Sequence, residues 1–331
     1  MTKFKALLVS ETADKQYARE IVERSVDDLP EGEVLIRVRY SSLNYKDALS
    51  ASGNRGVTRR YPHTPGIDAA GEVAASDSDR FSPGDKVLCC CYNLGMNKPG
   101  GFGQYIRVPE AWVMPCPEGL SLKEAMMYGT GGFTAALSVE KLMAGGVSPE
   151  DGKVLVTGAT GGVGSLSVAI LAKSGFTVVA ASGKSDQTEF FQSLGAAEVV
   201  GREAVTDKKG MVLLKTKWAG VIDTVGGEML ATALKSVKYG GVVTCCGNVA
   251  SPELPTTVYP FILRGVSLVG IEAAECDMAT RERVWGKLAD QWRIAGVENM
   301  VAEIGLAELP EQIELMLAGG HRGRIVVNLD R

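Results

Sequence analysis

Short hydrophobic runs alternate with helical patterns through the second half of the chain. Val154 to Thr157, Thr177 to Ala181 and Glu198 to Gly201 are strand-length runs, and an apolar-periodic helix, Ser165 to Ser174, separates the first two. Such alternation predicts βαβ units and a parallel sheet. Further strand and helix candidates follow in turn at residues 188–194, 220–223, 229–235, 241–246 and 266–270. We therefore predict a doubly wound α/β sheet in this part of the chain.

The part before Leu120 has a different pattern, rich in short strands. Strand candidates lie at residues 6–9, 34–40, 69–74, 86–91 and 105–108. Turn sequences at Pro65-Gly66 and at Ser82 to Asp85 separate some of them. This pattern predicts a compact, partly open β-barrel. A mostly helical pattern follows from Lys123 to Leu142, broken by the glycines at positions 129, 131 and 132.

The length of 331 residues predicts two domains, since single cores rarely grow much beyond ~250–300 residues. We expect a barrel-type catalytic domain at residues 1–123 and a nucleotide-binding domain at 124–271. The remaining segment, 272–331, contains two helix candidates (279–292 and 309–317) and a terminal strand (324–329). We expect this segment to return to the first domain.

A glycine-rich turn, Thr157 to Gly164, joins the first strand of the second domain to its helix. Glycines allow the backbone to turn tightly and approach a pyrophosphate, and the helix start offers free N–H groups to the phosphates. The order of strand, glycines and helix predicts a dinucleotide site with contacts from Thr160, Gly161, Gly162 and Val163. The alternative is a glycine-rich turn that binds no nucleotide.

The end of the second strand indicates which dinucleotide binds. NAD-binding units carry an acidic residue there for the ribose 2′-hydroxyl, whereas this chain has Ser182, Gly183 and Lys184. A hydroxyl and a cation favour a 2′-phosphate, and Arg202 follows the third strand, so we predict NADPH. In the alternative, Lys184 is a solvated loop residue and Ser182 or Ser185 caps a helix.

Composition argues against nucleic acid and membrane partners. The formal net charge is −4, and charged residues make up 22% of the chain. The apolar run within Met1 to Ser10 is too short for a signal peptide, and no run approaches the ~20 residues of a membrane helix. Seven cysteines without secretory context are typical of reduced thiols. We therefore expect a cytoplasmic protein.

Several motifs occur in a fixed order along the whole chain. They are Ser41 to Leu49, Pro65 to Gly71, Gly129 to Ala135, Thr157 to Ser165, Ile222 to Gly226 and Leu254 to Arg264. In these the chain resembles the zinc-free quinone-oxidoreductase-like branch of the medium-chain dehydrogenase/reductase superfamily, and within it the bacterial acryloyl-CoA reductase group. The resemblance implies a GroES-like β-barrel catalytic domain followed by a Rossmann domain.

We predict no metal site. The resemblance implies that zinc-dependent relatives hold their ion through a cysteine at the position of Asn44 or Tyr45 and a His-Glu pair at Ile67-Asp68, and this chain has replaced them. The contiguous Cys89-Cys90-Cys91 cannot converge on one ion, because adjacent strand residues face opposite sides. The two histidines, His63 and His321, are far apart in sequence.

Without a metal, nicotinamide chemistry suits reduction of an activated C=C bond. The resemblance places Tyr45 beside the nicotinamide, where it would shield the ring, bind the ribose or give a proton. Asn44 would donate to the thioester oxygen or fix the loop, and Lys46 and Asp47 would form a local ion pair. Alternatively this segment is only a well-packed helix start with Asn44 as its cap.

Four arginines and two further positions complete the predicted site. Arg55, Arg59 and Arg60 form the most basic short stretch and would meet coenzyme A phosphates, or else lie on a solvated loop. Arg324 would face the cleft or lie in a surface turn. Asn248 is a candidate nicotinamide contact, as is Ile262, for which a core or dimer-edge role is equally open. Cys245 and Cys246 are expected to be packing residues.

Three functions remain open at this point. The first is NADPH-dependent reduction of acryloyl-CoA, or a similar enoyl-CoA, to propanoyl-CoA by hydride transfer to the β-carbon. The second is a quinone or enal/enone reductase, and the third is a non-catalytic NADPH-sensing or RNA-binding module. By analogy with the superfamily, the apolar strand Val266 to Gly270 predicts a homodimer through the sheet edge.

Overall fold

The computed structural model describes residues 2–184 and 186–331, and the chain divides into two compact units. Unit 1 comprises Met1–Thr130, Ala274–Asp290 and Gly296–Arg331, and unit 2 comprises Gly131–Ala273 and Gln291–Ala295. The divisions after Thr130 and Ala273 lie close to the boundaries expected after residues 123 and 271. The short segment Gln291–Ala295 joins unit 2, which the sequence pattern does not indicate.

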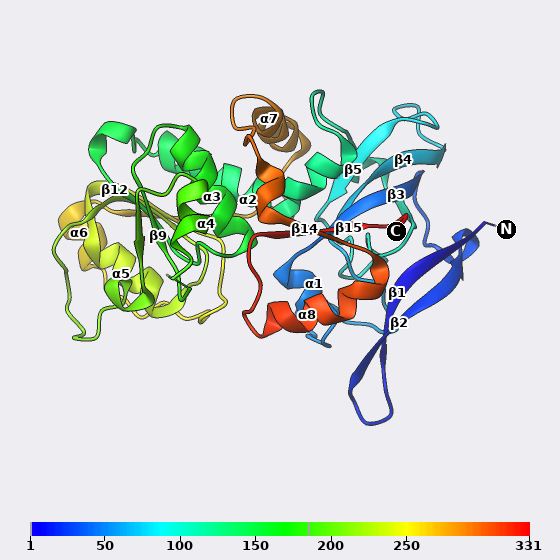
Figure 1. Cartoon of the computed structure of the whole chain (residues 1–331), viewed down its shortest axis with the longest axis horizontal. Coiled ribbons are helices and arrows are strands. Elements are labelled where there is room, and N and C mark those ends of the chain that lie inside the picture. The colour runs from blue at the N-terminus through cyan, green and yellow to red at the C-terminus, as the bar shows by residue number, and fades with distance from the viewer. Residues whose placement is uncertain (1, 185) are drawn as a thin grey trace. The chain divides into compact units, whose positions relative to one another are not determined.

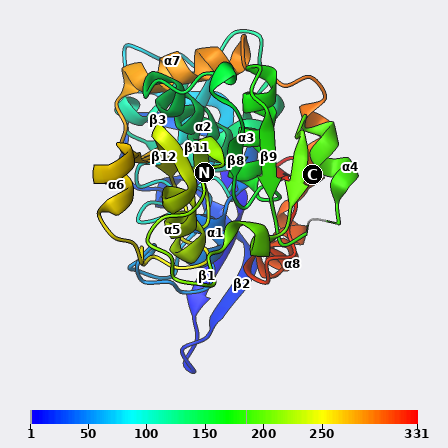
Figure 2. The same cartoon turned by 90° about the vertical axis from the view of Figure 1, so that its left-hand side faces the viewer.

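Unit 2 is built on a parallel sheet. Its strands are β8 (Val154–Val156), β9 (Val178–Ala181), β10 (Glu198–Val200), β11 (Trp218–Asp223), β12 (Val237–Cys245) and β13 (Ser267–Gly270). The spatial order is β10-β9-β8-β11-β12-β13, and every pairing is parallel. Figure 2 shows four of these strands, from β12 to β9, in this order. This is the 3-2-1-4-5-6 order of a Rossmann sheet, which confirms the predicted fold class.

Helices cover both faces of this sheet because alternate strand residues point to opposite sides. The helices are α3 (Gly162–Lys173), α4 (Thr188–Ser193), α5 (Gly227–Ser236) and α6 (Tyr259–Arg264). Leu155, Val179, Val221 and Val243 pack in one cluster with Leu234 of α5. Figure 2 shows α3 on one side of the strands and α5 on the other. The apolar runs of the strands are thus buried on both faces.

Unit 1 is a mostly antiparallel barrel-like assembly. Its strands are β1 (Lys3–Glu11), β2 (Tyr17–Ser25), β3 (Val34–Leu43), β4 (Asp68–Ser76), β5 (Lys86–Cys90), β6 (Tyr105–Val108), β7 (Met114–Pro115), β14 (Val301–Ile304) and β15 (Arg324–Asn328). The main order is β14-β15-β3-β4-β5-β7, β6 pairs with β3, and β1 and β2 form a hairpin. The terminal strand β15 lies beside β3 (Figure 1), so the end of the chain completes a sheet begun near its start.

The remaining helices connect and cover these strands. They are α1 (Tyr45–Ser50), α2 (Leu122–Ala144), α7 (Met278–Ala289) and α8 (Leu309–Leu317). Short 3-10 helices join other elements: η1 (Val26–Asp28), η2 (Glu110–Trp112), η3 (Pro149–Asp151), η4 (Arg202–Val205), η5 (Val297–Met300) and η6 (Leu306–Glu308). The division between the units falls inside α2, after Thr130.

A buried arginine anchors α7 within unit 1. Arg281 is 2% exposed, and its guanidinium donates to the backbone carbonyls of Cys276 (3.2 Å), Cys90 (3.1 Å) and Ala274 (2.7 Å). The same guanidinium lies 4.2 Å from the centre of the Tyr92 ring. These contacts hold α7 against the end of β5.

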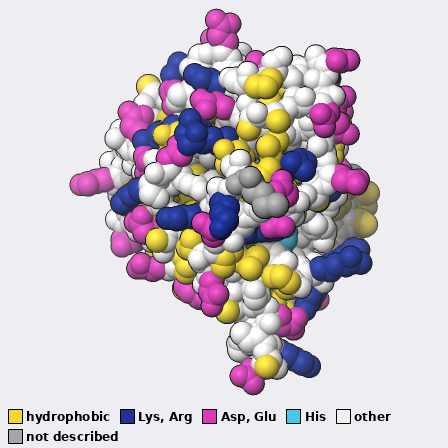
Figure 3. All heavy atoms as spheres, turned by 90° about the vertical axis from the view of Figure 1, so that its right-hand side faces the viewer, with side chains coloured by type: hydrophobic (Ala, Val, Ile, Leu, Met, Phe, Trp, Pro, Cys, Tyr) yellow, Lys and Arg dark blue, Asp and Glu magenta, His cyan; other side chains and the backbone are white. Residues whose placement is uncertain are grey.

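The surface carries charges of both signs. On the face shown in Figure 3, basic and acidic side chains are interspersed with apolar ones. Among the described residues, none of the helices combines the length and the apolar character needed to cross a membrane.

Candidate active site

The glycine turn of unit 2 has the geometry of a phosphate-binding loop. Gly158 has φ +58°, and a Cβ there would lie 2.3 Å from Oγ1 of Thr224. A Cβ on Gly164 would lie 2.3 Å from the carbonyl oxygen of Gly158, so both positions require glycine. Helix α3 begins at Gly162, three residues before the predicted start, because Gly161 already caps it in an extended conformation.

The first-turn N–H groups of α3 have no intrahelical acceptors, as at the start of any α-helix. The four residues predicted to contact phosphates, Thr160, Gly161, Gly162 and Val163, lie at this helix start. The sequence of the first turn contains no acidic side chain, so nothing there repels an anion.

Hydrogen bonds join β8 and β11 where the strand order reverses. Thr157 Oγ1 donates to Oδ1 of buried Asp223 at 2.7 Å, and Thr224 Oγ1 donates to the Thr157 carbonyl at 2.9 Å. The other Asp223 oxygen accepts from the N–H groups of Val225 and Gly226. Burial raises the pKa of Asp223. These bonds fix the crevice at the carboxyl edge, where open α/β sheets bind ligands.

The residues predicted to select NADPH lie together at the end of β9. Ser182 Oγ lies 3.2 Å from Thr160 Oγ1 and accepts from the Lys184 N–H at 3.0 Å. A Cβ on Gly183 would lie 2.6 Å from Nε of Arg202, so that guanidinium packs directly on the glycine. Ser182 does not cap a helix, as the alternative expected, because the next helix, α4, has Gln187 as its cap residue. Ser185, the other candidate cap, lies outside the described residues.

The two predicted nicotinamide contacts of unit 2 have different positions. Asn248 follows β12 at the carboxyl edge and is exposed. Ile262 is 68% exposed on α6, and two residues further Arg264 donates to the carbonyls of Lys235 and Val237 at the amino end of β12. This position of Ile262 favours the edge role over a nicotinamide contact, which requires the carboxyl edge.

Burial raises the pKa of Cys245, and it raises that of Cys246 to about 12. Both thiols are therefore protonated at neutral pH, which agrees with packing roles.

In unit 1 a kink in α2 opens onto a buried polar cluster. Gly129 has φ +51° and ψ −156°, which interrupts the helix. The kink turns Thr130 towards Asp68, and its N–H (2.9 Å) and hydroxyl (2.6 Å) both donate to that carboxylate. A Cβ on Gly129 would lie 2.5 Å from Ser42 Oγ, 2.6 Å from Asp68 Oδ2 and 2.8 Å from Arg324 Nη2.

Asp68 is the centre of this cluster and is fully buried. Besides the two bonds from Thr130, its carboxylate accepts from Ser42 Oγ at 2.5 Å and from Asn44 Nδ2 at 2.8 Å. Arg324 Nη2 lies 4.0 Å away and supplies the opposite charge. A buried carboxylate needs such donors and such a charge to offset its lost hydration.

Arg324 is 2% exposed, so the surface-turn interpretation was wrong. Its guanidinium donates to the Met127 carbonyl (3.2 Å), Asn44 Oδ1 (3.0 Å) and Ser42 Oγ (2.7 Å). Each of its nitrogen atoms therefore has a partner within the chain, which leaves little of the side chain for the substrate contact that we expected.

Asn44 precedes α1 as its cap residue, as the structural alternative predicts. Its amide nitrogen donates to Asp68 Oδ2, Asp47 Oδ2 and the Ser42 carbonyl, and its amide oxygen accepts from Arg324. With the amide engaged in this way, Asn44 fixes the loop and is not available to a thioester oxygen.

The expected ion pair between Lys46 and Asp47 was wrong. Asp47 is buried, and its carboxylate accepts from the N–H groups of Asn44 (2.9 Å), Gly66 (3.2 Å) and Ile67 (2.8 Å). Burial and the negative charge of Asp68 raise the pKa of Asp47 to about 7.

Tyr45 is the first residue of α1 and is half-buried against the unit 1 core. Within the part of the chain that the structure describes, its hydroxyl has no hydrogen-bond partner. The hydroxyl thus remains available for a ligand.

The basic loop of unit 1 contains one ordered arginine. Arg55 pairs with Glu11 at 2.5 Å, donates to the Arg59 carbonyl at 2.7 Å and lies 5.1 Å from the Tyr61 ring centre. Arg59 and Arg60 are exposed. The loop thus presents two solvent-facing guanidinium groups beside a fixed one.

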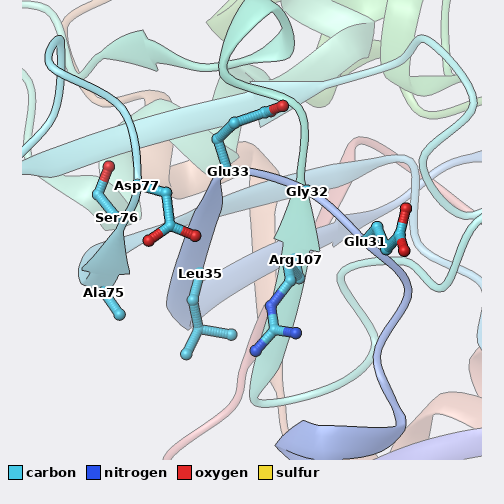
Figure 4. A pocket seen from close by; sticks show the side chains of 8 residues that line it. All are labelled: Glu31, Gly32, Glu33, Leu35, Ala75, Ser76, Asp77 and Arg107. Carbon is cyan, nitrogen blue, oxygen red and sulfur yellow. The ribbon is translucent and has the colours of Figure 1, made fainter.

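Two cavities, one in each unit, lie away from these residues. A cavity of about 490 Å³ in unit 1 is lined from separate segments by Glu31, Glu33, Asp77 and Arg107, among others (Figure 4). A second cavity, of about 370 Å³, adjoins Trp218 at the amino end of β11. Neither is lined by a residue of the predicted site.

Comparisons with known proteins agree with this architecture. Residues 30–118 match the alcohol dehydrogenase GroES-like domain family, and residues 162–288 match the zinc-binding dehydrogenase family. The putative quinone oxidoreductase YhfP of Bacillus subtilis is 45% identical over 99% of each chain. The acrylyl-CoA reductase AcuI of Ruegeria pomeroyi is 41% identical, again over 99% of each chain.

Solved structures match equally well. The yhdH oxidoreductase of Salmonella enterica, in complex with NADP, has a TM-score of 0.95 and 39% identity, covering 98% of this chain and 99% of that one. The Bacillus subtilis yhfP structure, with NAD bound, has a TM-score of 0.96 and 44% identity, covering 99% and 100%.

The barrel-type unit, the Rossmann unit and these full-length relatives define an oxidoreductase. The chain belongs to the medium-chain dehydrogenase/reductase superfamily, with near relatives among its quinone oxidoreductases and acrylyl-CoA reductases. The predicted membership is confirmed.

The name of the second matched family implies zinc, but the residues of unit 1 do not fit this ion. Ile67 offers only hydrocarbon, the Asp68 carboxylate is saturated with donors, and the Arg324 guanidinium already lies beside it. The Cys91 sulfur lies 3.0 Å from Oγ1 of Thr130, whose hydroxyl donates to Asp68. Among the described residues, no three His, Cys, Asp or Glu side chains group as metal ligands.

Replacing Gly129 with alanine is predicted to disrupt the Asp68 cluster. The methyl group would enter contacts of 2.5–2.8 Å at a positive φ, and strain and overpacking each cost ~1–3 kcal/mol. Urea unfolding will show the loss for Gly129→Ala. In the control, Gly286→Ala on α7, the added Cβ meets open space, so stability is retained. Equal stability of the two variants would contradict the prediction.

Asp47 is predicted to make stability depend on pH. Its carboxyl binds a proton more tightly when folded, so the free energy of unfolding should fall as pH rises from about 4 to about 7. Urea unfolding across this range should show a smaller decrease for Asp47→Asn than for the wild type. The exposed control, Asp14→Asn, should keep the wild-type slope. An unchanged slope in Asp47→Asn would refute this assignment.

Proposed function

We propose that this protein uses NADPH to reduce an activated C=C bond, with acryloyl-CoA or a similar enoyl-CoA as substrate and propanoyl-CoA as the product of acryloyl-CoA. The proposal is carried by two features that occur in one chain. The first is the group Ser182, Lys184 and Arg202 at the end of β9, called here the 2′-phosphate corner. The second is the Asp68 cluster of unit 1, whose residues do not fit zinc. The 2′-phosphate corner would bind the hydride donor, NADPH. The residues of the Asp68 cluster suit reduction of a C=C bond.

The cofactor assignment is supported by the end of β9. Ser182 and Lys184, with the Arg202 guanidinium on Gly183, provide a hydroxyl and two cations where NAD-binding units carry an acid. A phosphate dianion pairs well with such groups. The Salmonella enterica relative was solved with NADP. Of the two dinucleotides, NADPH is the one that this corner favours.

The reaction needs a hydride, a stabilised enolate and a proton. NADPH, when bound, would supply the hydride for the β-carbon, and the carbonyl oxygen of the substrate would carry the negative charge that develops. We assign proton delivery to the α-carbon, or contact with the nicotinamide ribose, to the Tyr45 hydroxyl, which has no hydrogen-bond partner among the described residues. The Asp68 cluster holds the loop before Tyr45 in place.

An enoyl thioester is favoured as substrate by the basic loop of unit 1. Arg59 and Arg60 are exposed, and Arg55 is held between Glu11 and the Tyr61 ring. Guanidinium groups recognise phosphates, which coenzyme A carries and simple quinones lack. The Ruegeria pomeroyi relative is named an acrylyl-CoA reductase, which agrees with this choice.

The second candidate is a quinone or enal/enone reductase. It is supported by the Bacillus subtilis relative, which is named a putative quinone oxidoreductase. Because the relatives are named as oxidoreductases, we set aside the non-catalytic alternative.

We also propose a homodimer formed through unit 2. The strand β13 ends the sheet order, so its outer edge has no strand neighbour among the described residues. Nearby α6 exposes Tyr259 (44%), Ile262 (68%) and Leu263 (57%). Apolar side chains beside an open sheet edge favour pairing with a second copy.

Substrate choice is tested by NADPH oxidation with acryloyl-CoA and with a benzoquinone at matched concentration. Faster turnover of the thioester is the expected result, because the basic loop offers phosphate contacts to it alone. Strong quinone turnover without thioester turnover would overturn the enoyl-CoA assignment and favour the second candidate.

Cofactor choice is tested by Lys184→Ala and Arg202→Ala. Each variant should raise KM for NADPH by about 10-fold, since a hydrogen bond to a charged group contributes ~1.5–3 kcal/mol. KM for NADH should change little, because NADH lacks the 2′-phosphate. The control Lys217→Ala lies at the amino end of β11 and should leave both values unchanged. If the variants raised KM for NADPH and KM for NADH equally, the proposed role of Lys184 and Arg202 in binding the 2′-phosphate would be refuted.

A further inference from the structure

We propose that Arg324 is a positioning residue for this reduction: its buried guanidinium, held between Asp68 and Asn44, fixes the junction of β3 and α1 that presents Tyr45. The inference rests on the proposed reductase function and replaces the substrate contact first expected of Arg324.

Three strands bring the participants together. β15 pairs with β3 in the register Ile325 to Leu43, so Arg324 lies opposite Asn44 where β3 ends. β4 runs along the other side of β3 and begins with Asp68. The first residues of β15 and β4 therefore lie beside the end of β3. This placement depends on the C-terminal segment returning to unit 1, because β15 is the strand that brings Arg324.

The contacts of Arg324 fix one orientation of the Asn44 amide. The amide oxygen accepts from Arg324 Nη1 at 3.0 Å, while the amide nitrogen donates to Asp68 Oδ2 at 2.8 Å. A flipped amide would place its nitrogen against the guanidinium and its oxygen against the carboxylate, which is repulsive in both places. Cation and anion together therefore determine the side-chain conformation at the helix start.

The guanidinium is itself fixed at three points. Nε donates to the Met127 carbonyl at 3.2 Å, and Nη2 donates to Ser42 Oγ at 2.7 Å, while Nη1 holds Asn44. A planar fork can make these divergent bonds at once, whereas the single ammonium of lysine cannot. Lysine would keep the charge beside Asp68 but lose the bonds that set the geometry.

The consequence falls on Tyr45, which follows Asn44 directly and begins α1. Tyr45 has no hydrogen bond of its own among the described residues, so its position depends on packing and on the junction before it. A misplacement of ~1 Å at a reacting group can cost ~10²-fold in rate. Arg324 thus acts on the reaction through Asn44 and Tyr45 and without touching the substrate.

The test compares Arg324→Lys with Arg281→Lys. Arg281 is a matched control, because it is equally buried in unit 1 and its bonds go to the backbone carbonyls of Cys90, Ala274 and Cys276, not to a side chain of the Asp68 cluster. Both variants should lose stability in urea unfolding. Only Arg324→Lys should lower kcat, by ~10²-fold, and the preference for NADPH over NADH should stay at the wild-type value because the residues proposed to bind the 2′-phosphate lie in unit 2.

A second variant separates positioning from folding. Arg324→Gln combined with Asp68→Asn removes the buried cation together with the carboxylate beside it, so neither partner of this pair is left unpaired. We expect this double variant to fold and to retain the loss of kcat. If Arg324→Lys or the folded double variant keeps kcat at the level of Arg281→Lys, Arg324 is purely structural and the proposal is overturned.

The choice of substrate keeps the two proposals distinguishable. Wild-type protein is assayed on acryloyl-CoA first, and on a benzoquinone if the thioester is not reduced. Failure on the thioester alone overturns the enoyl-CoA assignment, while the Arg324 comparison proceeds on the quinone. A wild-type protein that reduces neither acceptor overturns both proposals.

Discussion

The buried carboxylate of Asp68 constrains the whole of the candidate site in unit 1. Without water, such a group must be surrounded by donors and faced by a positive charge. The chain meets this need with Ser42, Asn44, Thr130 and Arg324, which come from β3, the cap residue of α1, the kinked helix α2 and β15. The kink at Gly129, the return of β15 and the orientation of Asn44 all follow from this single requirement.

A backbone constraint has the same role in unit 2. Gly158 and Gly164 allow the turn after β8 to pass within contact distance of its neighbours, and α3 then starts where a phosphate would lie. Thr157 and Asp223 join the two strands that flank the crevice. The nucleotide site is thus formed mainly by backbone geometry, whereas the site in unit 1 is formed by side-chain charge.

Sequence reasoning succeeded where the determining interactions are local. The β8–turn–α3 motif and the alternation of strands and helices are both contiguous patterns. It failed on β2, whose polar, half-exposed residues show no clear alternation. Gly129 within a helical pattern indicated the kink in α2. The sequence did not indicate that this kink brings Thr130 to Asp68.

The contrast is sharpest for the charged residues near Tyr45. Lys46 and Asp47 are adjacent and suggested an ion pair, yet Asp47 turns inward to the N–H groups of Gly66 and Ile67. Arg324 and Asp68 are far apart in sequence, and only the register of β15 against β3 brings them together. Local pattern determined the fold class and the glycine turn, and the resemblance to the superfamily identified the replaced zinc-ligand positions. The tertiary structure decided which charges are buried together, because burial, rather than sequence distance, sets the energy of an unpaired charge.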